Sequence, residues 1–138
     1  MLRARTHPSL RAGIVIAAVT GLGLVGLEQA AGAPAPTKPQ VRAHLAALRT
    51  DLLATLPVYR KGRYDAVRTG VGNTYFTHFE VLEQPLGRAN DTLKETIEHW
   101  IATDLRGIAK ARRPYAVYRA KVAQVLAKLP SAQRALGA

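Results

Sequence analysis

Hydrophobic residues recur every three or four positions in four separate parts of the chain, which is the spacing expected of amphipathic helices. The four series lie within residues 45–59, 64–82, 93–108 and 118–129. Residues that interrupt helices follow each series: Gly62, then Pro85 and Gly87, then Arg112-Arg113-Pro114, and finally Pro130. No segment has a convincing strand pattern. The spacing therefore predicts an all-α protein in which residues 41–138 form an antiparallel four-helix bundle.

Two features indicate where helices should begin. Residues 34–40 contain three prolines, which fix φ and remove backbone donors, so we expect a non-helical, Pro-rich spacer there. Asn90 to Thr92 offers a helix cap, and Thr92 and Glu95 have the spacing of a capping box. This motif predicts the start of the third helix.

The first 33 residues have the layout of an export signal. Three arginines precede an apolar run at 12–27, and the small residues at 30–33 follow it. The run is short for a membrane span, which needs about 20 residues, and Pro34 disfavours cleavage after Ala33 but not after Gly32. We expect residues 1–33 to be a signal peptide or a membrane anchor. The mature part would then be periplasmic or otherwise extracytoplasmic, and tethered to the inner membrane if the leader is retained. Because the leader carries arginines and no acid before Glu28, a mitochondrial presequence is the alternative.

The length of 138 residues and the composition exclude several classes of protein. This length suits one compact domain with a modest core. The chain has no cysteine, so it has no disulfide, thiolate metal site, iron–sulfur cluster or haem attachment motif. Its two serines, Ser9 and Ser131, do not lie in a nucleophile elbow, and no Gly-rich phosphate loop follows a strand. We therefore expect a protein that is not an enzyme.

The formal net charge is +11, and the basic residues are unevenly placed. After residue 33, all eight acidic residues lie between Asp51 and Asp104, whereas eight basic residues and no acid follow from Arg106 onward. This segment suits anionic lipid headgroups or a membrane complex. It would also suit nucleic acid, which the expected export makes an unlikely partner; the remaining interpretation is a solvated basic face. The residues that we expect to bind a partner or lipid are Arg106, Lys110, Arg112, Arg113, Arg119 and Lys121.

Carboxylates and an imidazole lie at helical spacing in the middle of the chain. Glu80 and Glu83 share one helix face, and Glu95 and His99 share another, with Glu98 beside His99. Facing helices that contribute such groups form metal sites in bundles, and oxygen ligands suit iron, manganese or calcium. We therefore predict a metal site, with iron as the candidate ion, at Glu80, Glu83, Glu98 and His99. The alternative interpretation is a solvated face, since the full di-metal signature, a Glu-x-x-His on each of two helices, is missing.

Part of the chain resembles a known family. The sequence Gly62-Arg63-Tyr64-Asp65-Ala66-Val67 is followed by Tyr75-Phe76-x-x-Phe79-Glu80-x-x-Glu83, and then by Leu93, Glu95, Ile97-Glu98 and Leu105-Arg106. These residues resemble the extracytoplasmic helical domain attached to high-affinity iron permeases. The distinctive element is Tyr-Phe-x-x-Phe-Glu.

The resemblance implies a role in iron handling outside the cytoplasmic membrane, with Glu80 and Glu83 as the positions carried over. The sequence has neither the multiple membrane spans of a permease nor the Arg-Glu-x-x-Glu motif of the transport helices. We therefore expect that this chain does not move iron across a membrane by itself. We expect it to bind or present iron to a membrane uptake component. The alternative is a non-catalytic structural accessory subunit that docks on a membrane complex through its basic C-terminal helix.

Overall fold

Residues 34–138 are described by the computed structural model, and they belong to one compact unit. This part of the chain is all-helical and contains no strand, which confirms the predicted fold class at that level. Within it, no helix combines the length and the apolar character that a membrane span requires. The predicted signal or anchor at 1–33 lies outside the described residues.

The unit is built from α-helices and two π-helical segments. Their order is α1 (Lys38–Arg60), α2 (Tyr64–Thr74), π-helix η1 (Tyr75–Phe79), α3 (Glu80–Glu98), π-helix η2 (His99–Leu105), α4 (Arg106–Lys110) and α5 (Tyr115–Ala135). The elements α2, η1 and the first part of α3 follow one another without a non-helical break up to Asn90 (φ −161°, ψ 89°). The rest of α3 continues through η2 into α4.

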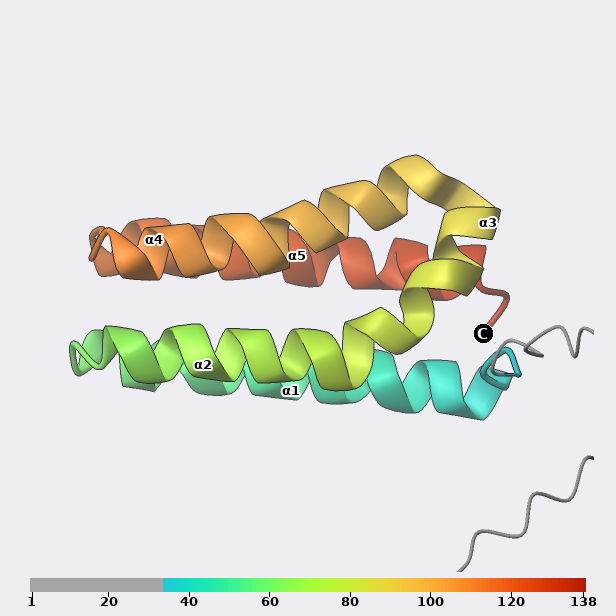
Figure 1. The fold of residues 1–138 in the computed structure, drawn as a ribbon, viewed down its shortest axis with the longest axis horizontal. Coiled ribbons are helices and arrows are strands. Elements are labelled where there is room, and N and C mark those ends of the chain that lie inside the picture. The colour runs from blue at the N-terminus through green and yellow to red at the C-terminus, as the bar shows by residue number, and fades with distance from the viewer. Residues whose placement is uncertain (1–33) are drawn as a thin grey trace, which may run out of the picture. The chain divides into compact units, whose positions relative to one another are not determined.

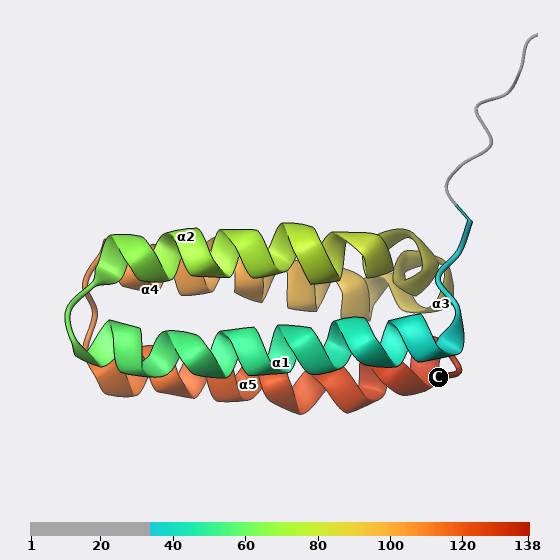
Figure 2. The same cartoon turned by 90° about the horizontal axis from the view of Figure 1, so that it is seen from below.

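The two tight turns of the unit lie at the same end. Figure 1 and Figure 2 show the turn between α1 and α2 beside the turn between α4 and α5. The start of α1, the bend of α3 and the C-terminus lie at the opposite end. Residues 61–63 and 111–114, which are far apart in the sequence, are therefore neighbours in space.

The first helix begins earlier than the spacer prediction allowed. Thr37 caps α1, since its side chain and the Gln40 side chain form a capping box, and Pro39 lies in the first turn. A proline is tolerated there because the first backbone N–H groups of a helix have no partner within the helix. The prediction of a non-helical spacer over 34–40 is therefore wrong for residues 38–40.

Two other predicted helix ends are also wrong. Pro85 and Gly87 lie inside α3, and Pro130 lies inside α5, which continues to Ala135. The helices pass through both prolines because the residues just beyond them, Leu86 and Ala132, are fully buried in the core.

The bend in α3 has a different cap from the predicted one. Asn90 accepts a hydrogen bond from the Leu93 backbone N–H at 3.0 Å, which is the N-cap arrangement. Thr92 already lies within the helix, and its carbonyl accepts from the Thr96 hydroxyl at 2.7 Å. The predicted region of the cap is thus confirmed, but the Thr92–Glu95 capping box is not formed.

The core is continuous and draws on all four hydrophobic series. Its fully buried members include Leu48, Leu52, Val71, Phe79, Leu82, Ile97, Ile101, Leu105, Tyr118 and Val125. Near the end with the two turns, Tyr59 and Tyr118 stack with ring centroids 4.1 Å apart. The Tyr118 hydroxyl donates to Thr55 Oγ1 at 2.7 Å, and Thr55 in turn donates to the Leu52 carbonyl. Aromatic packing and a satisfied polar pair thus join α5 to α1.

Candidate functional site: a cationic end of the helical unit

Positive charge is concentrated at the end of the unit that carries the two turns. We define this cationic end as residues 57–68 and 106–119, which contain nine basic residues and one acidic residue. The rest of the described chain contains eight basic and seven acidic residues. The excess charge of the unit therefore lies almost entirely at one end, where it adds to a single positive field.

The two turns have the same backbone hydrogen bonding. In the first, Gly62 N–H donates to the Tyr59 carbonyl and Arg63 N–H donates to the Val58 carbonyl. In the second, Arg112 N–H donates to Ala109 and Arg113 N–H donates to Ile108. Both are Schellman motifs, in which one residue takes a left-handed conformation. That residue is Gly62 in the first turn (φ 72°) and Arg112 in the second (φ 49°).

Arg112 is the one non-glycine residue with a left-handed φ in residues 34–138. A side chain at such a position costs about 1 kcal/mol, and glycine is the residue that avoids the cost. Strained backbone positions cluster at active sites, ligand clamps and switch regions. The guanidinium group of Arg112 is therefore a candidate binding group of this surface.

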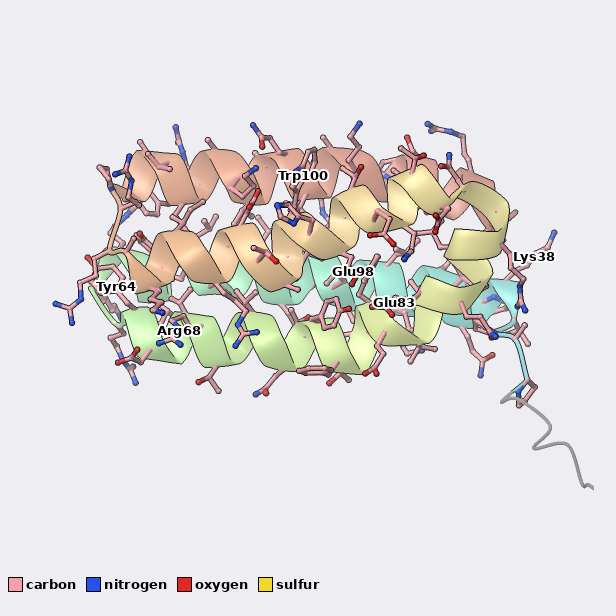
Figure 3. The ribbon with its side chains drawn as sticks, turned by 45° about the horizontal axis from the view of Figure 1, so that its top comes forward. Lys38, Tyr64, Arg68, Glu83, Glu98 and Trp100 are labelled. Carbon is pink, nitrogen blue, oxygen red and sulfur yellow. The ribbon has the colours of Figure 1, made fainter. Side chains whose placement is uncertain are left out.

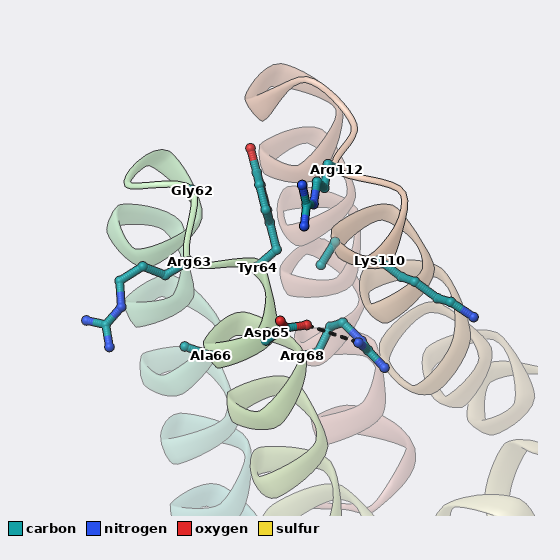
Figure 4. Close-up of a pocket in the computed structure, with 9 residues that line it drawn as sticks. Gly62, Arg63, Tyr64, Asp65, Ala66, Arg68, Lys110 and Arg112 are labelled. Carbon is teal, nitrogen blue, oxygen red and sulfur yellow. Dashed lines mark hydrogen bonds and ion pairs between the residues drawn. The ribbon is translucent and has the colours of Figure 1, made fainter.

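A cleft of about 350 Å³ opens between the two turns. Figure 4 shows Tyr64 and Arg112 facing one another across it, and the Arg112 guanidinium carbon lies 5.8 Å from the centre of the Tyr64 ring. Asp65 pairs with Arg68 at 3.1 Å, and the Lys110 side chain extends outward from the same cleft. Asp65 is exposed and is the only acid of the cationic end, so it offsets one of the nine positive charges.

Aromatic residues hold part of the cationic end in place. Arg60 lies over the Tyr115 ring at 4.7 Å and donates to its hydroxyl at 3.2 Å. The Tyr59 hydroxyl donates to the backbone carbonyl of Arg113, which ties α1 to the turn before α5. Stacked guanidinium groups of this kind lose less entropy when they bind an anion, because their orientation is already restricted.

The helix ends contribute little net charge to this surface. Neither α2 nor α5 has a side-chain cap, and both begin at the cationic end, where their N–H groups carry partial positive charge. The C-terminal ends of α1 and α4, which carry the opposite partial charge, lie at the same end. The positive field therefore comes from the basic side chains.

Five of the six basic residues predicted to bind a partner are exposed at this end. They are Arg106, Lys110, Arg112, Arg113 and Arg119. The sixth, Lys121, lies elsewhere: it pairs with Asp104 at 2.9 Å and lies over the Trp100 ring at 4.9 Å. The description of these residues as one basic C-terminal helix is also wrong, because only Arg119 and Lys121 belong to α5.

Sequence reasoning missed four members of the cationic end. Arg60, Lys61, Arg63 and Arg68 surround the first turn and lie far from Arg112 in the sequence. The sequence contained a signal that could have found them. In a chain of four antiparallel helices, the connection between the first two helices and the connection between the last two lie at the same end. The run Arg-Lys-Gly-Arg and the run Lys-Ala-Arg-Arg occupy those two turns.

The predicted metal ligands are only partly brought together. Figure 3 shows Glu83 and Glu98 near each other, on the two parts of α3 that meet at the bend. Glu80 is exposed, and His99 is exposed and pairs with Asp104 at 3.2 Å. Within residues 34–138, no three His, Asp or Glu side chains converge as ligands of one ion. The iron site therefore stays a prediction.

The Tyr75 hydroxyl lies near these carboxylates. It donates a hydrogen bond to Glu83. Burial, followed by this hydrogen bond, raises the pKa of Tyr75 above its ordinary value, and the charges of Glu83, Glu98 and Glu80 raise it further. Glu98 also accepts from Lys94 at 3.4 Å. Both carboxylates thus already have donors, which an incoming cation would have to displace.

Replacing Arg112 by glycine should change stability and anion binding in opposite directions. We expect Arg112→Gly to raise the free energy of unfolding by about 0.5–1 kcal/mol, because glycine accepts the left-handed conformation without strain. The same variant should bind anionic vesicles more weakly, because it loses one charge of the cationic end. Urea denaturation and vesicle co-sedimentation measure the two effects, with Arg113→Ala as a control that removes a charge without relieving strain. A variant that is no more stable than the parent would contradict the strain at Arg112.

Comparison with known proteins finds no matching protein family, no matching curated protein and no matching solved structure. The resemblance to the iron permease domain therefore rests on the sequence motif alone.

Proposed function

We propose that the chain is a non-catalytic accessory protein, an antiparallel four-helix bundle that docks on an anionic membrane surface through its cationic end. In this proposal the protein is extracytoplasmic, as the basic and apolar leader suggests. The observation that carries the proposal is the segregation of charge: nine basic residues and one acid at one end, against near balance elsewhere.

The number of charges supports this role. Each basic residue near an anionic bilayer contributes about 1 kcal/mol. Several contacts made together are therefore enough for stable but reversible binding. Seven of the nine basic residues are arginines, whose planar guanidinium groups pair with phosphate through two parallel hydrogen bonds. The start of α1 lies at the end of the unit opposite the cationic end.

Vesicle co-sedimentation tests the proposal. We expect the chain to bind vesicles that contain acidic phospholipid and to bind neutral phosphatidylcholine vesicles much more weakly. Binding should weaken as salt rises from about 0.05 to 0.5 M, because salt shortens the Debye length from more than 10 Å to less than 5 Å. Equal binding to neutral and acidic vesicles, or binding that salt leaves unchanged, would contradict the proposal and favour an acidic protein partner or the leader as the contact.

Iron binding is a second candidate function. The observation that favours it is that two of the predicted ligands, which lie on opposite sides of the α3 bend, come close to the same hydroxyl. Glu83 accepts a hydrogen bond from Tyr75, and the charge of Glu98 raises the pKa of Tyr75. Hard oxygen ligands of this kind suit ferric iron. Equilibrium dialysis against ferric iron should show binding that the double variant Glu83→Gln, Glu98→Gln loses. The exposed acids Asp91 and Glu95 supply the matched control variant, and iron bound equally by all three proteins would contradict this site.

A further inference from the structure

Two histidines from different helices meet on the side of the unit where α1 packs against η1. His44 belongs to α1 and His78 to η1, and their Nδ1 atoms lie 3.3 Å apart. The two rings are tilted by 53° with centroids 5.6 Å apart. His44 is half-buried and the His78 side chain is 19% exposed, so the pair is sheltered but can be reached from solvent. This arrangement was not predicted from the sequence.

A carboxylate behind His78 determines which ring nitrogen is free. Asp51 Oδ2 lies 3.4 Å from His78 Nε2, and the Thr74 hydroxyl holds the same oxygen at 2.9 Å. A carboxylate beside Nε2 favours the proton on that nitrogen and leaves the lone pair on Nδ1. This is the support that metal-binding histidines usually have on the side away from the ion.

The spacing of the two Nδ1 atoms fits two ligands of one ion. Zinc–nitrogen bonds of about 2.0–2.1 Å in a tetrahedral site place two nitrogens about 3.3–3.4 Å apart. Without an ion, the same two atoms are within hydrogen-bonding distance, and with the His78 proton on Nε2 the donor would be His44 Nδ1 and the acceptor His78 Nδ1. An ion would take the place of that proton once His44 carries its own proton on Nε2, and the rings would turn so that both lone pairs point at the ion.

No third His, Asp or Glu converges on the pair in residues 34–138, so water would have to complete the coordination of an ion. One further feature favours a ligand role over a purely structural contact. His78 lies in a π-helical turn, and such turns inside α-helices occur frequently at functional sites. Imidazole nitrogen suits zinc, copper or nickel better than it suits calcium or magnesium.

We propose that His44 and His78 form a two-histidine site for a divalent transition-metal ion, of which Zn²⁺ and Cu²⁺ are the best candidates, with Asp51 as the residue that positions His78. The ion would join α1 to η1 and so stabilise the folded chain. This site is separate from the carboxylates around Tyr75 and does not depend on the docking function.

Titration of the full chain with Zn²⁺, and separately with Cu²⁺, tests the site by isothermal calorimetry and thermal unfolding. We expect one ion per chain and a rise in melting temperature, both lost in the variants His44→Asn and His78→Asn. Asp51→Asn should weaken binding about 10- to 100-fold, as loss of a supporting carboxylate does at other metal sites. Variants of the other two histidines, His7→Asn and His99→Asn, are matched controls that should keep full binding.

A measurement on the unaltered chain distinguishes loss of the metal site from poor folding of the variants. In the unaltered chain, nitrogen-15 NMR of the histidine rings should show that Zn²⁺ shifts the Nδ1 resonances of His44 and His78 and leaves the ring of His99 unchanged. The double variant Glu83→Gln, Glu98→Gln should still bind Zn²⁺, which separates this site from the iron proposal. Binding that depends on His7 or His99, or no perturbation at either Nδ1, would overturn the proposal.

Discussion

Tyr118→Ala is expected to lower the free energy of unfolding by about 3–5 kcal/mol, the usual cost of truncating a large buried aromatic residue. Tyr118 is fully buried and stacks on Tyr59 at 4.1 Å. Its hydroxyl donates to Thr55 at 2.7 Å. The variant therefore leaves a cavity between α1 and α5 and removes the aromatic pair that lies beneath the cationic end.

Urea denaturation measures this loss. Tyr118→Phe, which keeps the ring and loses only the hydrogen bond, should cost about 1 kcal/mol. Val117→Ala is the control, because Val117 is the preceding residue on the same helix and is 39% exposed. It should change the free energy of unfolding by less than about 0.5 kcal/mol. A Tyr118→Ala variant within 1 kcal/mol of the parent would mean that the core is not packed as described.

Alkaline pH is expected to lower the free energy of unfolding, because it ionises the same tyrosine. Burial raises the pKa of Tyr118 from 10.0 to about 12. Because the folded protein holds this proton more tightly than the unfolded chain, the stabilising effect is complete below pH 10 and is lost as pH rises toward 12. A shift of two units corresponds to about 2–3 kcal/mol. Burial also raises the pKa of Tyr59, which adds to the loss.

Denaturation curves at several pH values between 8 and about 12 check this expectation. The free energy of unfolding should be flat near pH 8–9 and should fall with increasing slope above pH 10. In Tyr118→Phe the alkaline slope should be reduced, because one of the titrating groups is gone. An unchanged slope in this variant would show that Tyr118 does not carry the pH dependence.

The helical fold could be predicted because burial follows the hydrophobic spacing. Residues such as Leu48, Ile101 and Val125 lie at predicted core positions and are fully buried. The helix ends were harder, since a proline is a local signal whose effect depends on tertiary packing. Pro39 lies in a first turn, and Pro85 lies inside a helix with Leu86 buried beyond it.

The functional surfaces depend on contacts between residues that are distant in the sequence. The basic residues from Arg106 onward were found because they lie close together in the sequence, whereas Lys61 and Arg63 join them only when the chain folds back. His44 and His78 are 34 residues apart and meet for the same reason. Spacing within one helix predicted the carboxylates Glu80 and Glu83 as a pair, but Glu80 is exposed and Glu83 turns toward Tyr75.

In the proposed function, the positive charge at one end of the unit makes the docking contact. Charge reversal at two places on the unit tests it directly, by comparing affinities for vesicles that contain acidic phospholipid. One variant carries Lys61→Glu, Arg63→Glu and Arg113→Glu; the other carries Lys38→Glu, Arg42→Glu and Arg49→Glu, which change the net charge equally but lie on α1 outside the cationic end. All six side chains are exposed. At about 1 kcal/mol per basic residue, we expect the first variant to lose at least about 100-fold in affinity and the second to lose much less. Equal losses in the two variants would contradict the account, because binding would then follow net charge and not the cationic end.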